Sequence, residues 1–175
     1  MDITHLLAGT MIYLGGKAET VEDGIRISKQ QIDNGEAFQK WLDIVDEQGG
    51  DTDMIKSPEK YPKAQYEFEI KADKAGYLTE MNSYEIGMAS VEMGAGRKKK
   101  EDDVDPQAGI VLKKKIGDKI EKGETIMVGY TNNPSAIEAS SDQLIGAVTI
   151  AETEPESVNL ISHIIDKDGS RAFEL

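Results

Sequence analysis

The stretch that decides the fold is Gly109–Tyr130, GIVLKKKIGDKIEKGETIMVGY. It predicts a strand, two tight turns and a second strand. Gly117-Asp118 and Lys122-Gly123 supply the turns, because glycine adopts positive φ without steric cost. The apolar side chains expected on its buried side are Ile110, Leu112, Ile116 and Ile120. A β unit of this size needs partner strands to cover that side.

Three other segments have the pattern of such partner strands. Residues 66–71 (YEFEIK) alternate apolar and charged side chains, which is the period-2 signal of a half-buried strand. Gly76 interrupts this pattern, and residues 77–81 resume it as a second strand. A short third strand is predicted at 148–150. We expect all three to lie beside the Gly109–Tyr130 stretch.

Helices are predicted between these strands. One covers residues 84–93 with Asn82 or Ser83 as its N-cap, and another begins at its cap Ser135 and ends near Leu144. From about residue 64 the order is therefore β, β, α, charged loop, β, β, α, β. This order predicts an α+β fold, and no interpretation is offered for residues 152–175.

The N-terminal third predicts three short amphipathic helices, over residues 2–16, from Thr20 to Asn34 and over 36–48. Their helical spacing places Trp41, like several methionines including Met11, in a core, whereas His5 is expected at a surface or an interface. Residues 51–63 form a connector, since two prolines there force extended backbone on the residues before them. The predicted division is a helical segment over 1–55 and a second subdomain over 64–175.

Composition excludes several classes of function. The formal charge is −13 and the isoelectric point is near 4.6, which weighs against nucleic-acid binding because phosphate contacts dominate that affinity. No apolar run approaches the roughly 20 residues that span a bilayer, and the first ten residues lack the pattern of a secretory signal. There is no cysteine, which is compatible with a reducing compartment. We therefore expect a cytoplasmic protein without nucleic-acid or membrane partners.

The other candidate sites favour structural interpretations. Asp73-Lys74-Ala75 is similar to a lipoyl-attachment tripeptide, but no glycine-cornered strand precedes it, so a carrier domain is the weaker alternative. His5 and His163 each stand alone, and the carboxylates are spread evenly, so neither a metal site nor an acid–base pair is predicted. Gly94-Ala95-Gly96-Arg97 and the lysines after it lack the spacing of a P-loop and predict a solvated loop.

Several blocks in this order resemble the C-terminal part of the pyrimidine nucleoside phosphorylases, the family that includes thymidine phosphorylase. The blocks are MIYLGGKAETVEDG (11–24), QGGD (48–51), AGYLTEMNSYEIG (75–87), EMGAGRKKKEDDVD (92–105) and GIVLKKKIGDKIEKGE (109–124). The resemblance implies a homodimeric pentosyltransferase of pyrimidine metabolism and nucleoside salvage. Such an enzyme splits pyrimidine nucleosides with phosphate into free base and (deoxy)ribose 1-phosphate, and phosphate is its co-substrate.

The resemblance also implies an α/β-hammerhead, a barrel-sandwich-like subdomain, for the C-terminal part. It places the catalytic residues elsewhere, because the family's Ser-Gly-Arg and Thr-Gly-Gly-Thr signatures do not occur in this chain. No catalytic, substrate-binding or metal residue, and no cofactor, is therefore predicted here.

We expect a shortened piece of the enzyme or the product of a split reading frame. Alone it would be inactive, and its partner would be the remainder of the phosphorylase or a second copy of itself. Gly94, Ala95, Gly96 and Arg97 are the candidate loop for domain closure in the complete enzyme. A stand-alone binding module is the alternative function.

Overall fold

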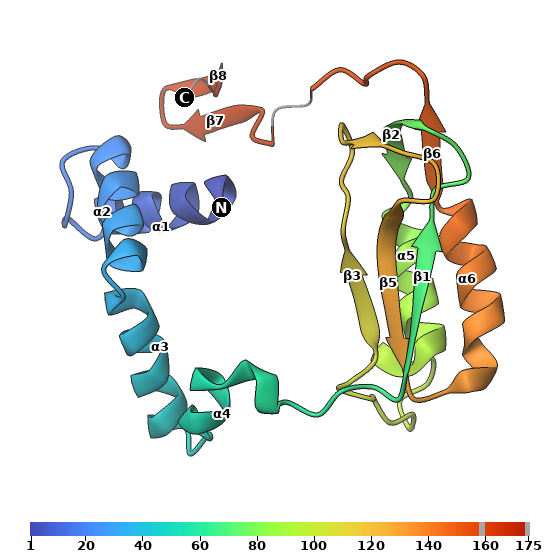
Figure 1. The fold of residues 1–175 in the computed structure, drawn as a ribbon. Helices are drawn as coiled ribbons and strands as arrows, with labels where there is room; N and C mark the ends of the chain where they lie inside the picture. Colours follow the sequence, from blue (N-terminus) through green and yellow to red (C-terminus); the bar gives the residue numbers. More distant parts are fainter. Residues whose placement is uncertain (158–159, 174–175) are drawn as a thin grey trace. The chain divides into compact units, whose positions relative to one another are not determined.

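A computed structural model describes residues 1–157 and 160–173 (Figure 1). The chain forms two compact units, and each is described by itself. One is Pro62–Ser157, and the other is Met1–Tyr61, with which the C-terminal segment groups. Helices and strands are both present, so the α+β class predicted from the sequence is confirmed. The hammerhead architecture and the division into 1–55 and 64–175 stay predictions.

The helical unit consists of α1 (Asp2–Leu14), α2 (Val21–Asp33), α3 (Glu36–Glu47), α4 (Thr52–Lys56) and the 3-10 turn η1 (Pro58–Lys60). The second helix begins where the sequence predicts, because the Thr20 hydroxyl accepts a hydrogen bond from the Asp23 N–H at 3.1 Å. Asp51 caps α4 in the same way through the N–H groups of Asp53 and Met54. No helix within residues 1–157 and 160–173 has the length and apolar content needed to cross a membrane.

The first two helices approach each other through glycines. A Cβ on Gly24 would lie 2.1 Å from the Gly9 carbonyl oxygen, so no larger residue fits this crossing without moving a helix. Beside it, His5 Nδ1 lies 3.0 Å from the Ser28 hydroxyl, and both side chains are buried. Of the two positions predicted for His5, a surface or an interface, the surface is therefore wrong, because His5 is buried where α1 meets α2. Its helix turns its small and polar side toward α2.

The larger apolar side chains of this unit are exposed. Trp41 is 51% exposed and meets the edge of the Phe38 ring, with ring centroids 6.1 Å apart. Met11 is 72% exposed. The core positions predicted for Trp41 and Met11 are therefore wrong, and Leu42 is the buried side chain of α3 instead.

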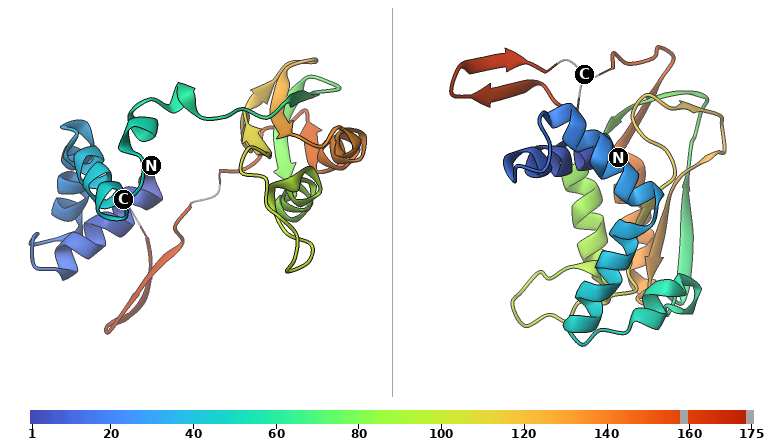
Figure 2. Two further views of the ribbon diagram at one scale, coloured as in Figure 1. Left: turned by 90° about the horizontal axis from the view of Figure 1, so that it is seen from below. Right: turned by 90° about the vertical axis from the view of Figure 1, so that its left-hand side faces the viewer.

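The second unit holds six strands in two antiparallel sheets of order β1-β5-β3 and β4-β2-β6. The strands are β1 (Tyr66–Lys71), β2 (Gly76–Met81), β3 (Gly109–Leu112), β4 (Lys119–Ile120), β5 (Thr125–Thr131) and β6 (Val148–Ala151). The helical elements are α5 (Ser83–Ser90), the π-helical turn η2 (Val91–Ala95), the 3-10 turn η3 (Pro134–Ala136) and α6 (Ile137–Gly146). Helices α5 and α6 lie side by side, and α6 contacts β1 (Figures 1 and 2).

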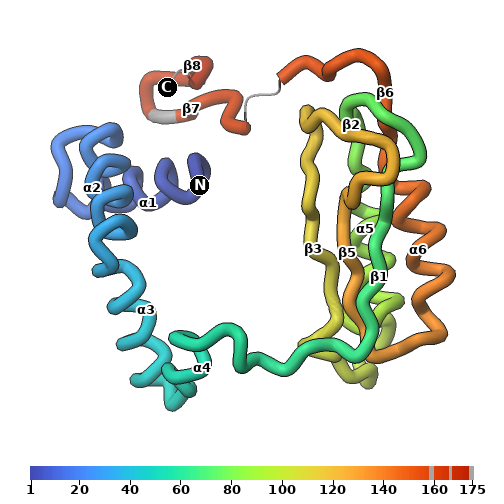
Figure 3. Tube along the Cα trace, in the orientation of Figure 1, coloured from blue at the N-terminus to red at the C-terminus, as the bar shows by residue number. Residues whose placement is uncertain are grey.

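The stretch Gly109–Tyr130 joins the two sheets. Its outer strands β3 and β5 lie side by side in one sheet (Figure 3). The short β4, which lies between them in the sequence, pairs with β2 in the other sheet. Two of the three predicted partners are confirmed, since β5 pairs with β1 and β4 with β2. The third prediction is wrong, because β6 pairs with β2 instead.

Two turns of the same design surround β4. The Lys115 N–H donates to Asp118 Oδ2 at 2.7 Å, and the Glu121 N–H donates to Glu124 Oε2 at 2.9 Å. The third residue of each turn is a glycine with positive φ, Gly117 at +96° and Gly123 at +84°. This is the geometry of a type II turn, which explains why the sequence needs glycine there.

The core lies between the sheets and the helices. It is built from Ile70, Ala72, Leu78, Ala89, Ile120, Ile126, Met127, Leu144 and Ile150. Consecutive residues of β5 are buried, so this central strand is covered on both faces. Ile120 is buried as predicted, whereas Leu112 and Ile116 are 42% and 53% exposed. Their predicted burial is therefore wrong, and the core side chains of the stretch are Ile120 and, from β5, Ile126 and Met127.

Of the two helix N-caps predicted in this unit, one is confirmed. Asn82 Oδ1 accepts from the N–H groups of Tyr84 and Glu85, so Asn82 caps α5 as predicted. The cap Ser135 predicted for the next helix is wrong: Asn133 caps the turn η3 by accepting from the Ser135 N–H at 3.2 Å, and α6 has no side-chain cap. Farther along, residues 163–172 form a hairpin of β7 (His163–Asp166) and β8 (Gly169–Ala172).

Candidate functional site

The candidate closure loop leaves the end of α5 through the π-helical turn η2. Gly94 lies within this turn with φ +106°, a conformation that L side chains rarely adopt. A Cβ on Gly96 would lie 2.7 Å from Cγ2 of Val91, a β-branched side chain with little freedom to move. Both glycines are therefore required where the loop begins. Ala95 is half-buried, and Arg97 is exposed.

The far end of the loop is fastened to β5. The Asp105 N–H donates to the Gly94 carbonyl at 2.8 Å, which closes the loop at its base. The Asn132 amide donates to Asp105 Oδ2 at 2.9 Å and to Gln107 Oε1 at 3.1 Å. The Thr131 hydroxyl is buried and donates to the Met93 carbonyl at 2.7 Å. These bonds fix both ends of the loop while its middle projects from the sheet unit (Figure 2).

The middle of the loop carries exposed charges of both signs. Asp102 Oδ2 accepts the N–H groups of Lys98 and Lys99 at 3.0 and 2.9 Å, and Lys98 Nζ pairs with Glu92. The side chains of residues 97–101 are exposed, as expected for a solvated loop. Two backbone N–H groups and the Lys98 ammonium of this segment are therefore already bonded to carboxylates, and the segment lacks the spacing of a P-loop.

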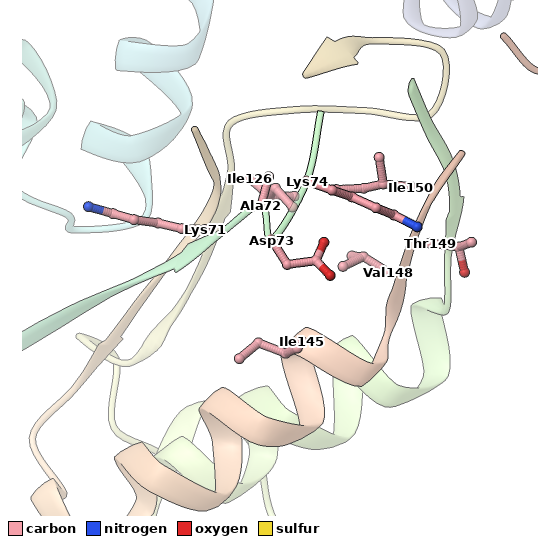
Figure 4. Close-up of a pocket in the computed structure, with 9 residues that line it drawn as sticks. All are labelled: Lys71, Ala72, Asp73, Lys74, Ile126, Ile145, Val148, Thr149 and Ile150. Carbon is pink, nitrogen blue, oxygen red and sulfur yellow. The ribbon is translucent and has the colours of Figure 1, made fainter. Parts of the chain in front are cut away.

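A cavity of about 190 Å³ lies beside the bend between β1 and β2. Its walls include the apolar side chains Ile126, Ile145, Val148 and Ile150. Figure 4 shows the Asp73 carboxylate turned toward Ile145 and Val148, while the Lys71 ammonium extends away from the other labelled side chains. Lys71 and Lys74 line the cavity together with Asp73, so its charged side chains are of both signs.

The same bend bears on the carrier alternative. Lys74 follows β1 and precedes β2, but these strands lie in different sheets and do not pair with each other. Lys74 is therefore placed between two sheets rather than at the tip of a hairpin, and this gives the carrier interpretation no support. Within residues 1–157 and 160–173, no three histidines or carboxylates come together in a way that could hold a metal ion.

Comparison with known proteins identifies the relatives of the chain. The family described as "Pyrimidine nucleoside phosphorylase C-terminal domain" matches residues 77–151, which include most of β2, the candidate closure loop and the whole Gly109–Tyr130 stretch. Two curated pyrimidine-nucleoside phosphorylases of Staphylococcus aureus, from strains bovine RF122 / ET3-1 and USA300, are 44% and 43% identical over 154 residues. The chain is related to the C-terminal region of these phosphorylases.

The match covers most of this chain but a minor part of its relatives. It includes 86% of the chain and 35% of each phosphorylase. The resemblance stated from the sequence blocks is thus confirmed. The candidate closure-loop residues fall within the matched domain. The hydrogen-bond network at the base of the loop was not predicted from the sequence. Its members Asp105 and Asn132 are 27 residues apart, and no local pattern relates them.

Proposed function

We propose that the chain supplies the C-terminal structural region of a pyrimidine nucleoside phosphorylase. The complete protein would convert a pyrimidine nucleoside and phosphate into free base and (deoxy)ribose 1-phosphate. The observation that carries the proposal is the 44% identity over 154 residues to a pyrimidine-nucleoside phosphorylase, of which the chain spans 35%. In this role the two sheets form a rigid scaffold, and the chemistry belongs to residues outside the chain.

The geometry supports a structural role. Phosphorolysis needs donors that hold an anion and groups that polarise the leaving base. At the lysine segment and in the cavity beside β1, carboxylates stand next to the cationic side chains. Asp102 and Glu92 engage the lysine segment, and Asp73 faces the cavity beside β1. The chain by itself is therefore expected to lack phosphorolysis.

An assay of the purified chain with uridine or thymidine and phosphate tests this expectation. No release of base above the uncatalysed rate is expected, whereas the intact Staphylococcus aureus phosphorylase serves as the active control. A chimaera supplies the positive arm. In it, this chain replaces the matching C-terminal region of that phosphorylase, and phosphorolysis is expected. Release of base by the chain alone at the rate of the control enzyme would overturn the proposal.

We further propose that the loop beginning at Gly94–Arg97 helps to close the complete enzyme over its substrate. Its base is fixed by hydrogen bonds, its middle is exposed, and its glycines allow the backbone to turn. Gly94→Ala or Gly96→Ala in the chimaera should lower turnover and raise KM together. Gly109→Ala is the control, since nothing lies near its added Cβ. Unchanged kinetics in both loop variants would contradict this role.

A further inference from the structure

The helix α1 is unusual in this chain because it carries so little charge. Residues 3–16, ITHLLAGTMIYLGG, contain no Asp, Glu, Lys or Arg, although 30% of all residues are charged. A helix with so little charge is stable in water only when its apolar sides are covered. The packing of α1 against α2 therefore indicates how much of this cover the helical unit provides.

One side of α1 is closed by α2. Gly9 and Gly24 bring the two backbones into contact, and the His5–Ser28 pair is buried next to them. Four large apolar side chains are exposed at spacings of three and four residues, which places them along one stripe of the helix. This apolar face of α1 consists of Ile3 (44% exposed), Leu7 (60%), Met11 (72%) and Leu14 (76%).

The net charge of this chain and the length of its relatives indicate what covers this face. A second copy is disfavoured, because two chains with a formal charge of −13 repel each other. A polar or charged ligand is disfavoured as well, because the face has no ionisable group. The related phosphorylases are nearly three times as long as the matched segment, so most of their chain has no counterpart here.

We propose that the apolar face of α1 is the docking surface for the N-terminal part of a pyrimidine nucleoside phosphorylase. This inference rests on the function proposed above and adds the side chains that make the contact. The Gly9–Gly24 crossing holds α1 by its small-residue side and presents Leu7 and Met11 outward. Burial of these two side chains would link the C-terminal scaffold to the part of the enzyme that carries the chemistry.

The test compares one double variant in two settings. Leu7→Glu/Met11→Glu in the isolated chain should leave its thermal unfolding unchanged, because both side chains are exposed there. In the chimaera with the Staphylococcus aureus phosphorylase, the same variant should lower the unfolding temperature and reduce phosphorolysis by about tenfold or more. Ile116→Glu is the matched control, since it places a charge on a similarly exposed apolar residue outside α1.

The possible outcomes separate the two proposals. If the double variant of the chimaera matches the wild-type chimaera and the control, the docking surface is overturned while the proposed function stands. The docking surface is also overturned if the variant unfolds the isolated chain, or if it dissolves a defined dimer of that chain. If the wild-type chimaera neither unfolds cooperatively nor releases base, the proposed function is overturned, and the docking surface with it.

Discussion

At the residue scale, one ion pair connects the second turn of the Gly109–Tyr130 stretch to the segment that follows β3. Glu124 pairs with Lys114 Nζ and also accepts the Glu121 N–H at 2.9 Å. The hydrogen bond from Lys114, and next the one from the Glu121 backbone, hold the pKa of Glu124 below its usual range. The same hydrogen bond raises the pKa of Lys114 above its usual range. Both shifts favour the charged pair in the folded state.

These shifts predict how stability depends on pH. The contribution of Glu124 is present above its unfolded pKa of about 4.3 and is lost as the pH falls through the lower folded value. Glu124→Gln should therefore lower the unfolding temperature near neutral pH and make it less sensitive to acid. Thermal unfolding from about pH 3 to pH 7 measures this. The exposed Glu156→Gln is the control, and equal acid sensitivity in both variants would contradict the role of the pair.

At the scale of elements, the crossing of α1 and α2 depends on the absence of a side chain. Gly24→Ala should destabilise the helical unit by about 1–3 kcal/mol, because its Cβ would meet the Gly9 backbone rather than a movable side chain. Gly87→Ala is the control, since nothing lies near its added Cβ in α5. It should stabilise its helix by up to about 1 kcal/mol. Thermal unfolding followed by far-UV circular dichroism distinguishes the two, and equal effects would contradict the close crossing.

The same crossing shows where sequence patterns stop being informative. The period-2 alternation of β1 has only one interpretation, and its predicted range matches the structure. After Asp2, no side of α1 carries a charge, so periodicity cannot say which side is buried. Close approach of two backbones selects the side with Gly9 and His5, and this choice depends on Gly24 and Ser28 in another helix.

The candidate loop likewise has features that the sequence predicts and features that it does not. Gly94 and Gly96 could be recognised in the sequence because glycine has a local conformational meaning. The bonds that fasten the loop could not, since Asn132 reaches Asp105 only after β5 is in place between β1 and β3. Likewise, the exposure of Trp41 could not be inferred from its helical spacing. An apolar stripe requires burial, but it does not say whether the same chain supplies the cover.

At the scale of the whole molecule, Trp41 can serve as a fluorescent probe of the electrostatic potential that the net charge creates. It is the single tryptophan and is 51% exposed. Its helix α3 carries four carboxylates, those of Glu36, Asp43, Asp46 and Glu47, and the ammonium of Lys40. The negative potential of the chain should concentrate cations and exclude anions around the indole, and salt should screen this effect beyond a Debye length of about 10 Å at 0.1 M.

Collisional quenching of Trp41 fluorescence tests this field. Caesium should quench more efficiently than iodide at low ionic strength, relative to the ratio that free N-acetyltryptophanamide shows. Added sodium chloride should bring the two ratios together, while quenching by neutral acrylamide should be strong and independent of salt. A caesium-to-iodide ratio equal to that of the free compound at low salt would mean that the charge of −13 creates no negative potential at α3. Weak quenching by acrylamide would instead mean that another surface covers Trp41 in solution.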